Sequence, residues 1–130
     1  MVTGKCDCGK VSFQVEEVRD TVTICHCSHC SQCRRTSGHV WASTHAPSEE
    51  LSFIADEGLT WYASSDFAKR GFCKFCGSSL FYKMNDKNSI AIAAGCLDAP
   101  TNLEIGKHIF VKDKGDYYEI TDGAPQIEKF

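Results

Sequence analysis

The chain has 130 residues, a mass of 14.4 kDa and a net charge of −3, with 42% hydrophobic and 24% charged residues. This size and composition predict a single globular domain over residues 1–130, and the scattered basic residues argue against nucleic-acid binding. The sequence lacks both the apolar run of about 18 residues that a membrane helix needs and an apolar export signal, so we expect a cytoplasmic protein that does not bind membranes.

The elements expected along the chain are short strands separated by turn signals. Residues 10–18 alternate in hydrophobicity, which places Val11, Phe13 and Val15 on one face. Further strands are expected at 21–25, 39–44, 51–55, 59–64, 78–83, 89–94, 108–111 and 116–120. Turn sequences such as APS, DEG, NDKN and DAP lie between them. No amphipathic helix longer than about two turns is evident, so the sequence favours a mainly β domain of small sheets.

Cysteine is the most informative residue type in this sequence, with nine copies. Disulfides are typical of exported proteins, whereas these cysteines are tightly clustered in a chain without an export signal. Clustered thiols in a reducing compartment are more typical of metal binding, so we interpret the clusters as metal sites.

The first cluster consists of two pairs, Cys6 with Cys8 and Cys73 with Cys76, and each pair is followed by glycine. Neither pair can satisfy zinc alone, but the two together supply the four thiolates of a structural site. Such a site would join the N-terminal strand to the middle of the chain, and its binding energy would contribute directly to folding. Two buried free thiols or a redox CxxC are the alternatives.

The second cluster is the stretch CHCSHCSQC at residues 25–33. Cys25 ends an apolar strand, and Cys25, Cys27 and Cys30 can supply three ligands from one compact loop. Three thiolates and one exchangeable position make a catalytic site, whereas four protein ligands make a closed one. Cys33 is therefore either a small buried residue or a fourth ligand that closes the site.

Several other side chains are candidates for supporting roles. His26 and His29 could be general bases, donors to the metal ligands or solvent-facing loop residues. His108 is interpreted as a structural hydrogen-bonding residue, and Cys96 as a small packing residue. The aromatic residues expected in the core or in a pocket wall are Trp41, Trp61, Phe72, Phe81 and Phe110.

With these residues identified, the chain resembles the glutathione-dependent formaldehyde-activating enzyme (GFA) family, which also includes the domain of centromere protein V. The resemblance runs nearly end to end. It rests on GKCDCGKVSF, the CHC motif, CRRTSG at 33–38, WYASSDFAKRGFCKFCGSSLF at 61–81, AAGCLDAP at 93–100 and HIFVKDKGDYYEITDGAP at 108–125.

The resemblance implies a mainly β, Mss4-like fold of small coiled sheets with zinc knuckles, and two zinc ions per chain, the second of them labile. Cys6, Cys8, Cys73 and Cys76 match the structural ligands. The family writes the second site as C-H-C-x-x-C followed directly by basic residues. Cys25, Cys27 and Cys30 match this pattern from the N-terminal side, and a reading from the C-terminal side selects Cys30 and Cys33 with Ser28 in place of the first cysteine. Serine is a poor zinc ligand, so we favour the first set.

The implied activity is that of a zinc-dependent carbon–sulfur lyase, which condenses formaldehyde with glutathione or acts on another small thiol adduct. Catalysis would then rest on Cys25, Cys27 and Cys30. Arg34, Arg35, Lys69 or Arg70 could anchor the carboxylates of glutathione, unless they are ordinary surface residues. Two other functions stay open: a non-catalytic binding or scaffold module with two structural zinc sites, and a thiol redox sensor.

Overall fold

The computed structural model describes residues 1–27 and 33–130. These residues form a mainly β structure with little helix, as predicted from the sequence. The strands are β1 (Val2–Lys5), β2 (Ser12–Val15), β3 (Thr21–Cys25), β4 (Trp41–Pro47), β5 (Leu51–Ala55), β6 (Leu59–Tyr62), β7 (Ala68–Cys73), β8 (Ser79–Met84), β9 (Ser89–Ala93) and β10 (Glu104–Ile109). The helices are α1 (Cys33–Ser37) and the 3-10 turns η1 (Ser48–Glu50), η2 (Ala94–Cys96) and η3 (Val111–Asp113).

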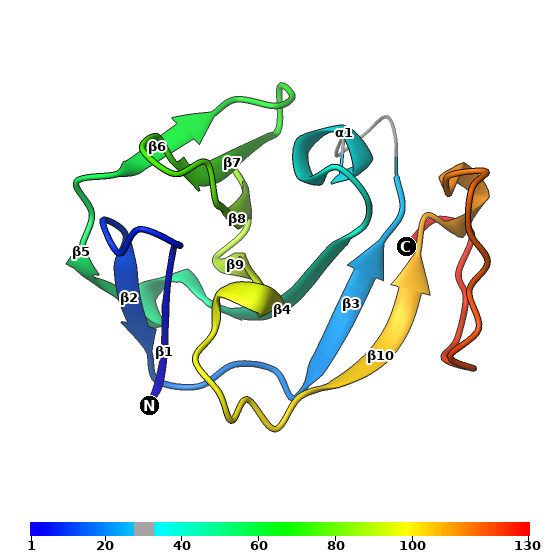
Figure 1. Ribbon diagram of the computed structural model, residues 1–130, viewed down its shortest axis with the longest axis horizontal. Coiled ribbons are helices and arrows are strands. Elements are labelled where there is room, and N and C mark those ends of the chain that lie inside the picture. The colour runs from blue at the N-terminus through cyan, green and yellow to red at the C-terminus, as the bar shows by residue number, and fades with distance from the viewer. Residues whose placement is uncertain (28–32) are drawn as a thin grey trace.

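The strands make two sheets of different size (Figure 1). The smaller sheet has the order β1-β2-β5, and the larger has the order β10-β3-β4-β9-β8-β7-β6. The pairing of β10 with β3 is parallel, and the other named pairs are antiparallel. Strands β3 and β10 lie side by side at one end of the molecule, while the smaller sheet lies at the other (Figure 1).

The main core lies between the smaller sheet and one face of the larger sheet. Val11, Phe13 and Val15 have no exposed surface and share one hydrophobic cluster, as the alternation of residues 10–18 predicted. Phe81 of β8 has no exposed surface, and its ring packs edge-on against Phe13 with the ring centroids 5.2 Å apart. Burial of these side chains supplies most of the stabilisation of a domain of this kind.

The opposite face of the larger sheet carries a second, smaller cluster. In β9, Ile90 and Ile92 belong to the main core, whereas the alternate residues Ala91 and Ala93 belong to the second cluster. Successive side chains of a strand point to opposite faces of the sheet, so this division follows from the period of two. The larger sheet therefore separates the main core from the surface on which the second cysteine cluster lies.

The structure differs from the predicted elements in one strand that is absent and in two strands that were not predicted. The strand expected at 116–120 is absent from the described residues. Backbone hydrogen bonds instead join the end of β10 and the residues just after it to residues 125–129. One of them runs from the His108 amide to the Pro125 carbonyl at 2.8 Å. Strands β1 and β7 were not predicted. β1 has only four residues and contains Gly4, where an added Cβ would lie 2.5 Å from the Phe13 ring.

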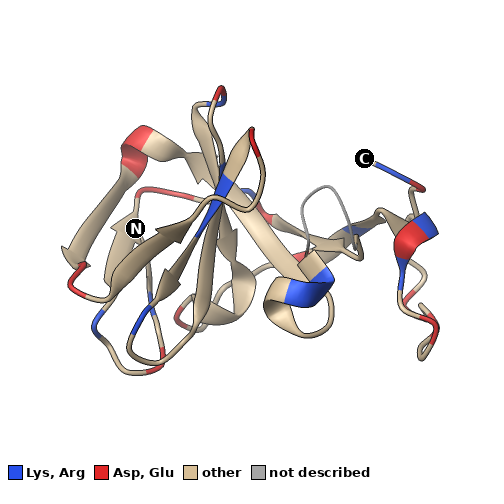
Figure 2. Cartoon of the chain, turned by 90° about the horizontal axis from the view of Figure 1, so that it is seen from above, with Lys and Arg blue, Asp and Glu red and all other residues tan. Residues whose placement is uncertain are grey.

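Charged residues are distributed over strands, loops and α1, with acidic positions between basic ones (Figure 2). The basic pair of α1 is Arg34 and Arg35. Among the helices of residues 1–27 and 33–130, none has the length and apolar character required to span a membrane.

Candidate metal centres

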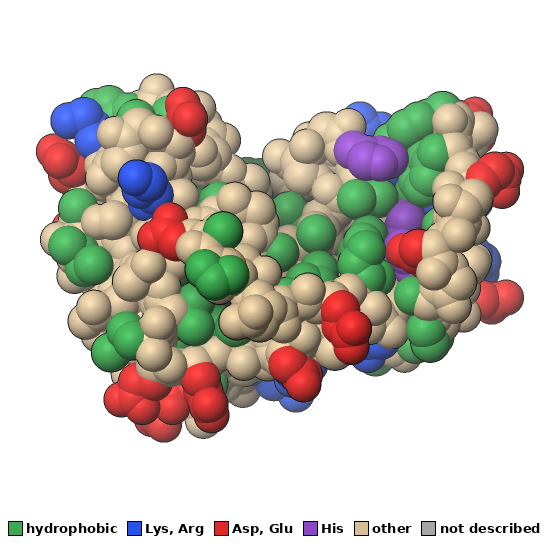
Figure 3. All heavy atoms as spheres, turned by 60° about the horizontal axis from the view of Figure 1, so that its bottom comes forward, with side chains coloured by type: hydrophobic (Ala, Val, Ile, Leu, Met, Phe, Trp, Pro, Cys, Tyr) green, Lys and Arg blue, Asp and Glu red, His purple; other side chains and the backbone are tan. Residues whose placement is uncertain are grey.

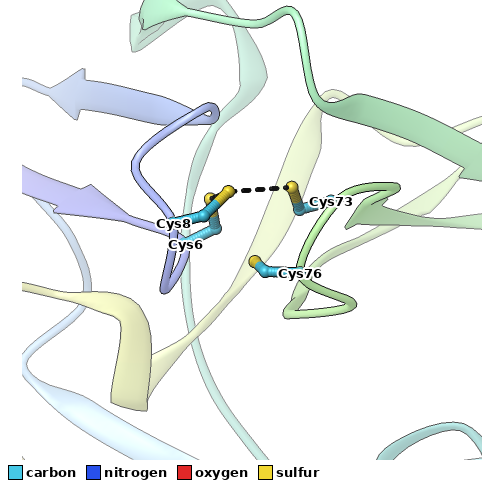
Figure 4. Close-up of side chains that lie close together, drawn as sticks. All are labelled: Cys6, Cys8, Cys73 and Cys76. Atoms are coloured by element: carbon cyan, nitrogen blue, oxygen red, sulfur yellow. Dashed lines mark hydrogen bonds between the residues drawn. The ribbon is translucent and has the colours of Figure 1, made fainter.

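The first metal centre is formed by two turns that face each other beside the main core, to which Cys6 and Cys73 belong. Cys6 directly follows β1, Cys8 lies in the turn after it, Cys73 ends β7, and Cys76 lies in the following turn. Their four sulfur atoms lie within 4.8 Å of one another and point toward a common centre (Figure 4). The Cys6–Cys8 and Cys8–Cys73 sulfur pairs are both 3.7 Å apart.

These distances fit a tetrahedral metal site. With Zn–S bonds of about 2.3 Å, tetrahedral geometry places sulfur atoms about 3.8 Å apart. The donor set of four thiols is also the one that zinc prefers in structural sites. The four cysteines of the first centre can therefore hold one metal ion.

Backbone geometry explains why both turns present their sulfur atoms. Gly9 and Gly77 have φ of +83° and +80°, a conformation that glycine adopts without strain. In the first turn the amide of Val11 donates to the Cys6 sulfur at 3.3 Å. In the second, hydrogen bonds from the Ser78 side chain and then from its backbone lower the pKa of Cys76 to about 5. Donors of this kind stabilise the thiolate form that binds metal.

The second metal centre brings together Cys25, Cys27 and Cys33, whose sulfur atoms lie within 4.8 Å of one another and are all buried. Cys25 is the last residue of β3, and Cys33 is the first residue of α1. Cys30 and His29 lie outside the described residues, so the predicted set of Cys25, Cys27 and Cys30 stays a prediction. Cys33, the alternative ligand in the sequence, lies beside the other two.

Backbone hydrogen bonds hold the short helix α1 at the second centre. The Arg34 amide donates to the Cys27 carbonyl at 3.0 Å, which joins the start of the helix to the CHC segment. The helix ends at Ser37 and is followed by Gly38, whose φ is +83° and whose amide donates to the Arg34 carbonyl at 2.8 Å. These bonds hold Cys33 over the end of β3.

The second centre needs a positive charge if its thiols are to ionise together. Hydrogen bonds with the Cys27 and Cys33 thiols, followed by burial, raise the pKa of Cys25. One such charge is already present, because Nη2 of Arg70 donates to the Cys33 sulfur at 3.4 Å. A metal ion would supply the rest, since a coordinating thiol is deprotonated by the metal.

Arg70 is enclosed by this site rather than solvated. Its side chain is only 3% exposed, and its guanidinium carbon lies 4.8 Å from the Tyr82 ring centroid and 5.4 Å from that of Trp41. The alternative that this arginine is an ordinary surface residue is therefore wrong. Lys69 instead lies over the Trp61 ring, at 4.5 Å from the centroid.

A cavity of about 630 Å³ opens beside the second centre. Cys25 and Cys33 line it, whereas Cys27 is fully buried. The other lining residues are Thr23, Trp41, Ser43, His45, Phe67, Arg70, Tyr82, Met84, Lys87, Ala91, Ile109, Phe110 and Phe130. Trp41 and Phe110 are thus pocket-wall residues, one of the two roles predicted for them, and Phe81 belongs to the core. The space-filling view shows hydrophobic side chains gathered in a hollow of the molecule with histidines beside it (Figure 3).

A chain of hydrogen bonds leads from the second centre to the C-terminal segment. His26 pairs through Nδ1 with the Tyr118 hydroxyl and through Nε2 with Nδ1 of His108, at 2.9 Å for the latter. Nε2 of His108 lies 2.9 Å from one carboxylate oxygen of Asp122, which confirms His108 as a hydrogen-bonding residue. Burial, followed by the charge of His108, lowers the pKa of His26 to about 4, so this ring is neutral at pH 7.

Both ring nitrogens of His26 are engaged in this chain, and His26 is absent from the residues that line the described cavity. His26 is only 1% exposed, so the alternative of a solvent-facing loop residue is wrong. Its ring hydrogen bonds are with Tyr118 and His108 and not with a metal ligand, so the geometry gives it a positioning role that the sequence analysis did not predict. Its ring ties the segment between Cys25 and Cys27 to Tyr118, 92 positions further along the chain.

Comparison with known proteins shows the family of the chain that carries these two centres. The family model of the glutathione-dependent formaldehyde-activating enzymes matches residues 1–113. The chain belongs to this family. An uncharacterized lyase of Schizosaccharomyces pombe is 28% identical over 124 residues, which cover 92% of this chain and 85% of the yeast protein. A crystal structure of a Rhodobacter sphaeroides protein is similar with a TM-score of 0.60 and 25% identity, over 79% of this chain and 98% of that one.

The part of this GFA-family chain that matches the family model contains all the cysteines of both centres, but it ends before Tyr118 and Asp122. These two residues were not identified from the sequence, because nothing in a local pattern connects them with histidines more than ten positions away. Tyr82 and Met84 were also missed as pocket residues. Their spacing of two on β8 was the available signal, since it places both on one face of the strand.

Proposed function

We propose that this GFA-family chain is a zinc-dependent carbon–sulfur lyase that acts on the adduct of a small thiol and an aldehyde, such as S-(hydroxymethyl)glutathione. The observation that carries the proposal is the cluster of Cys25, Cys27 and Cys33, of which the first and the last line a cavity large enough for an organic ligand. Family membership and the lyase name of the yeast relative support it. Two zinc ions per chain are part of the proposal.

The four-cysteine centre is assigned a structural role. Cys6, Cys8, Cys73 and Cys76 come from two turns that the core fixes in place, and four protein ligands leave no position for a substrate. The centre that Cys25, Cys27 and Cys33 form among the described residues is assigned the catalytic role, because a site with three protein ligands keeps one position free. Zinc bound there would supply a Lewis acid that favours the thiolate form of a ligating thiol.

In the direction of synthesis, the thiol sulfur forms a bond to the carbonyl carbon, and the proton of the thiol ends on the carbonyl oxygen. The protein contributes orientation, because a thiol in the cavity has its sulfur beside Cys25 and Cys33 and its carbon body against the walls. Arg70 offsets part of the negative charge of the cluster through its hydrogen bond to Cys33. His26, held by Tyr118 and His108, positions the segment that carries Cys25 and Cys27.

An anomalous-difference map across the zinc edge, from crystals grown with zinc and soaked with a thiol, tests the proposal. We expect a metal peak on Cys25, Cys27 and Cys33 with the sulfur of the added thiol as fourth neighbour, and acceleration of thiol–formaldehyde exchange measured by NMR. A peak with four protein sulfurs, Cys30 included, and no added thiol would refute the lyase and leave a non-catalytic module with two structural zinc sites.

A further inference from the structure

The C-terminal part of the chain reaches the second centre through one row of hydrogen-bonded side chains. The row consists of Tyr118, His26, His108 and Asp122, in this order. Its two histidines are 1% and 4% exposed, so the middle of the row is closed to solvent. Tyr118 and Asp122 lie beyond residue 113, where the match to the family model ends. The two ends of the row are therefore supplied by a segment that the family model does not cover.

His26 is the residue through which this row acts on the metal ligands. It lies between Cys25 and Cys27 in the chain, so the orientation of its side chain is linked to the two peptide units that carry these ligands. Its backbone amide donates to the Ile109 carbonyl at 3.1 Å, which ties the segment to the end of β10. The ring of Tyr118 stacks on that of His26, with the ring centroids 5.6 Å apart and an interplanar angle of 20°. Tyr118 thus restrains His26 by stacking and by a hydrogen bond.

The direction of donation along the row is determined at its Asp122 end. A carboxylate only accepts hydrogen bonds, so Nε2 of His108 carries a hydrogen and donates to Asp122 at 2.9 Å. With both rings neutral, Nδ1 of His108 then accepts from Nε2 of His26. Nδ1 of His26 in turn accepts from the Tyr118 hydroxyl, so each ring nitrogen of the row has a partner. Removal of this hydroxyl would leave a buried acceptor unpaired, which is costly.

We propose that Tyr118 is a positioning residue of the second centre, and that the row it begins sets how tightly Cys25 and Cys27 hold their metal ion. This inference rests on the proposed function, which places a metal ion on these thiols. Tyr118 acts through His26, by fixing the ring between the two ligands. Side chains that orient metal ligands from outside the ligand set typically contribute about 10–100-fold to metal affinity.

Competition for zinc tests the inference with Tyr118→Phe, which keeps the stacked ring and removes only the hydroxyl. The zinc-loaded protein is titrated with a chromophoric zinc chelator, and the Kd of each centre is obtained from the two steps of release. The variant Cys33→Ser, which removes one thiol of the second centre, identifies the step that belongs to it. Tyr118→Phe should raise the Kd of the second centre by about 10–100-fold and leave that of the four-cysteine centre within about twofold. Asp122→Ala, at the other end of the row, should also weaken the second centre alone.

The neighbouring tyrosine supplies a matched control. The Tyr117 hydroxyl pairs with Nδ1 of His39, an exposed histidine that belongs to neither cysteine cluster. Tyr117→Phe removes the same kind of bond and should leave both Kd values within about twofold. An unchanged second centre in Tyr118→Phe, or equal weakening of both centres, would overturn the inference while the lyase proposal stands. If the unmodified protein holds only one zinc ion, the second centre binds no metal, and both the proposed function and the inference fail.

Discussion

The four-cysteine centre gives the sharpest prediction for stability, through the substitution Cys8→Ser. Cys8 is exposed, and serine is nearly isosteric with it, so packing changes little. Exposed substitutions away from special features usually change the free energy of unfolding by less than about 0.5 kcal/mol. A larger loss in the free energy of unfolding would therefore result from the missing metal ligand and not from lost side-chain contacts.

The expected magnitude follows from linkage between metal binding and folding. If loss of one thiolate weakens zinc binding about a thousandfold, the stabilisation lost is about 4.1 kcal/mol. For a chain of this size, each kcal/mol corresponds to about 3–5 °C in Tm, which gives a decrease of about 12–20 °C. Complete removal of the metal would cost more: structural zinc contributes about 10–16 kcal/mol, against a net stability of about 5–15 kcal/mol.

Thermal unfolding followed by circular dichroism, with zinc content measured on the same samples, is the assay. The control is Cys96→Ser, a half-buried cysteine outside both clusters, which should shift Tm by only a few degrees because serine can keep the hydrogen bond to the Ser79 carbonyl. A Cys8→Ser protein that melts within about 2 °C of the unmodified one and has lost its structural zinc would refute the reasoning.

Three further predictions concern other parts of the molecule. Phe81→Ala should lower the free energy of unfolding by about 3–5 kcal/mol in denaturant titrations, because a fully buried ring is removed; a loss below about 1 kcal/mol would contradict the assigned core. A chelator should remove metal from the second centre before the four-cysteine centre, so mass spectrometry under native conditions should show a species with one zinc ion. Simultaneous loss of both ions would contradict the assignment of one structural and one catalytic centre. Hydrogen bonds from the Ala124 amide and then from His108 lower the pKa of the Asp122 carboxyl in the folded protein. The ionised carboxylate therefore stabilises the fold at a pH above its unfolded-state pKa, and this stabilisation is lost as the pH falls through its lower folded-state pKa. Asp122→Asn should therefore be less stable at neutral pH and converge with the unmodified protein in acid, and a constant difference down to the lowest pH would refute this.

Much of the fold could be predicted because its signals are local. The alternation of residues 10–18 identified the buried face of β2, and the β-branched run 21–25 gave β3 its exact bounds. The strand expected at 116–120 was wrong, since Tyr118 is held by side-chain contacts with His26 and not by a ladder. β7 escaped prediction because Lys69 and Arg70 interrupt its apolar pattern, and burial of Arg70 is a tertiary effect.

The sequence by itself determined the cysteine pairs, the turns that carry them and the family to which the chain belongs, because spacing within a turn is a property of neighbouring residues. Only the tertiary structure decided that Cys33 lies beside Cys25 and Cys27, that Arg70 is buried against these thiols, and that aromatic side chains from distant segments enclose one cavity. These contacts depend on which strands pair and which face of the sheet each residue occupies. No local pattern encodes those choices, since they minimise the free energy of the whole chain.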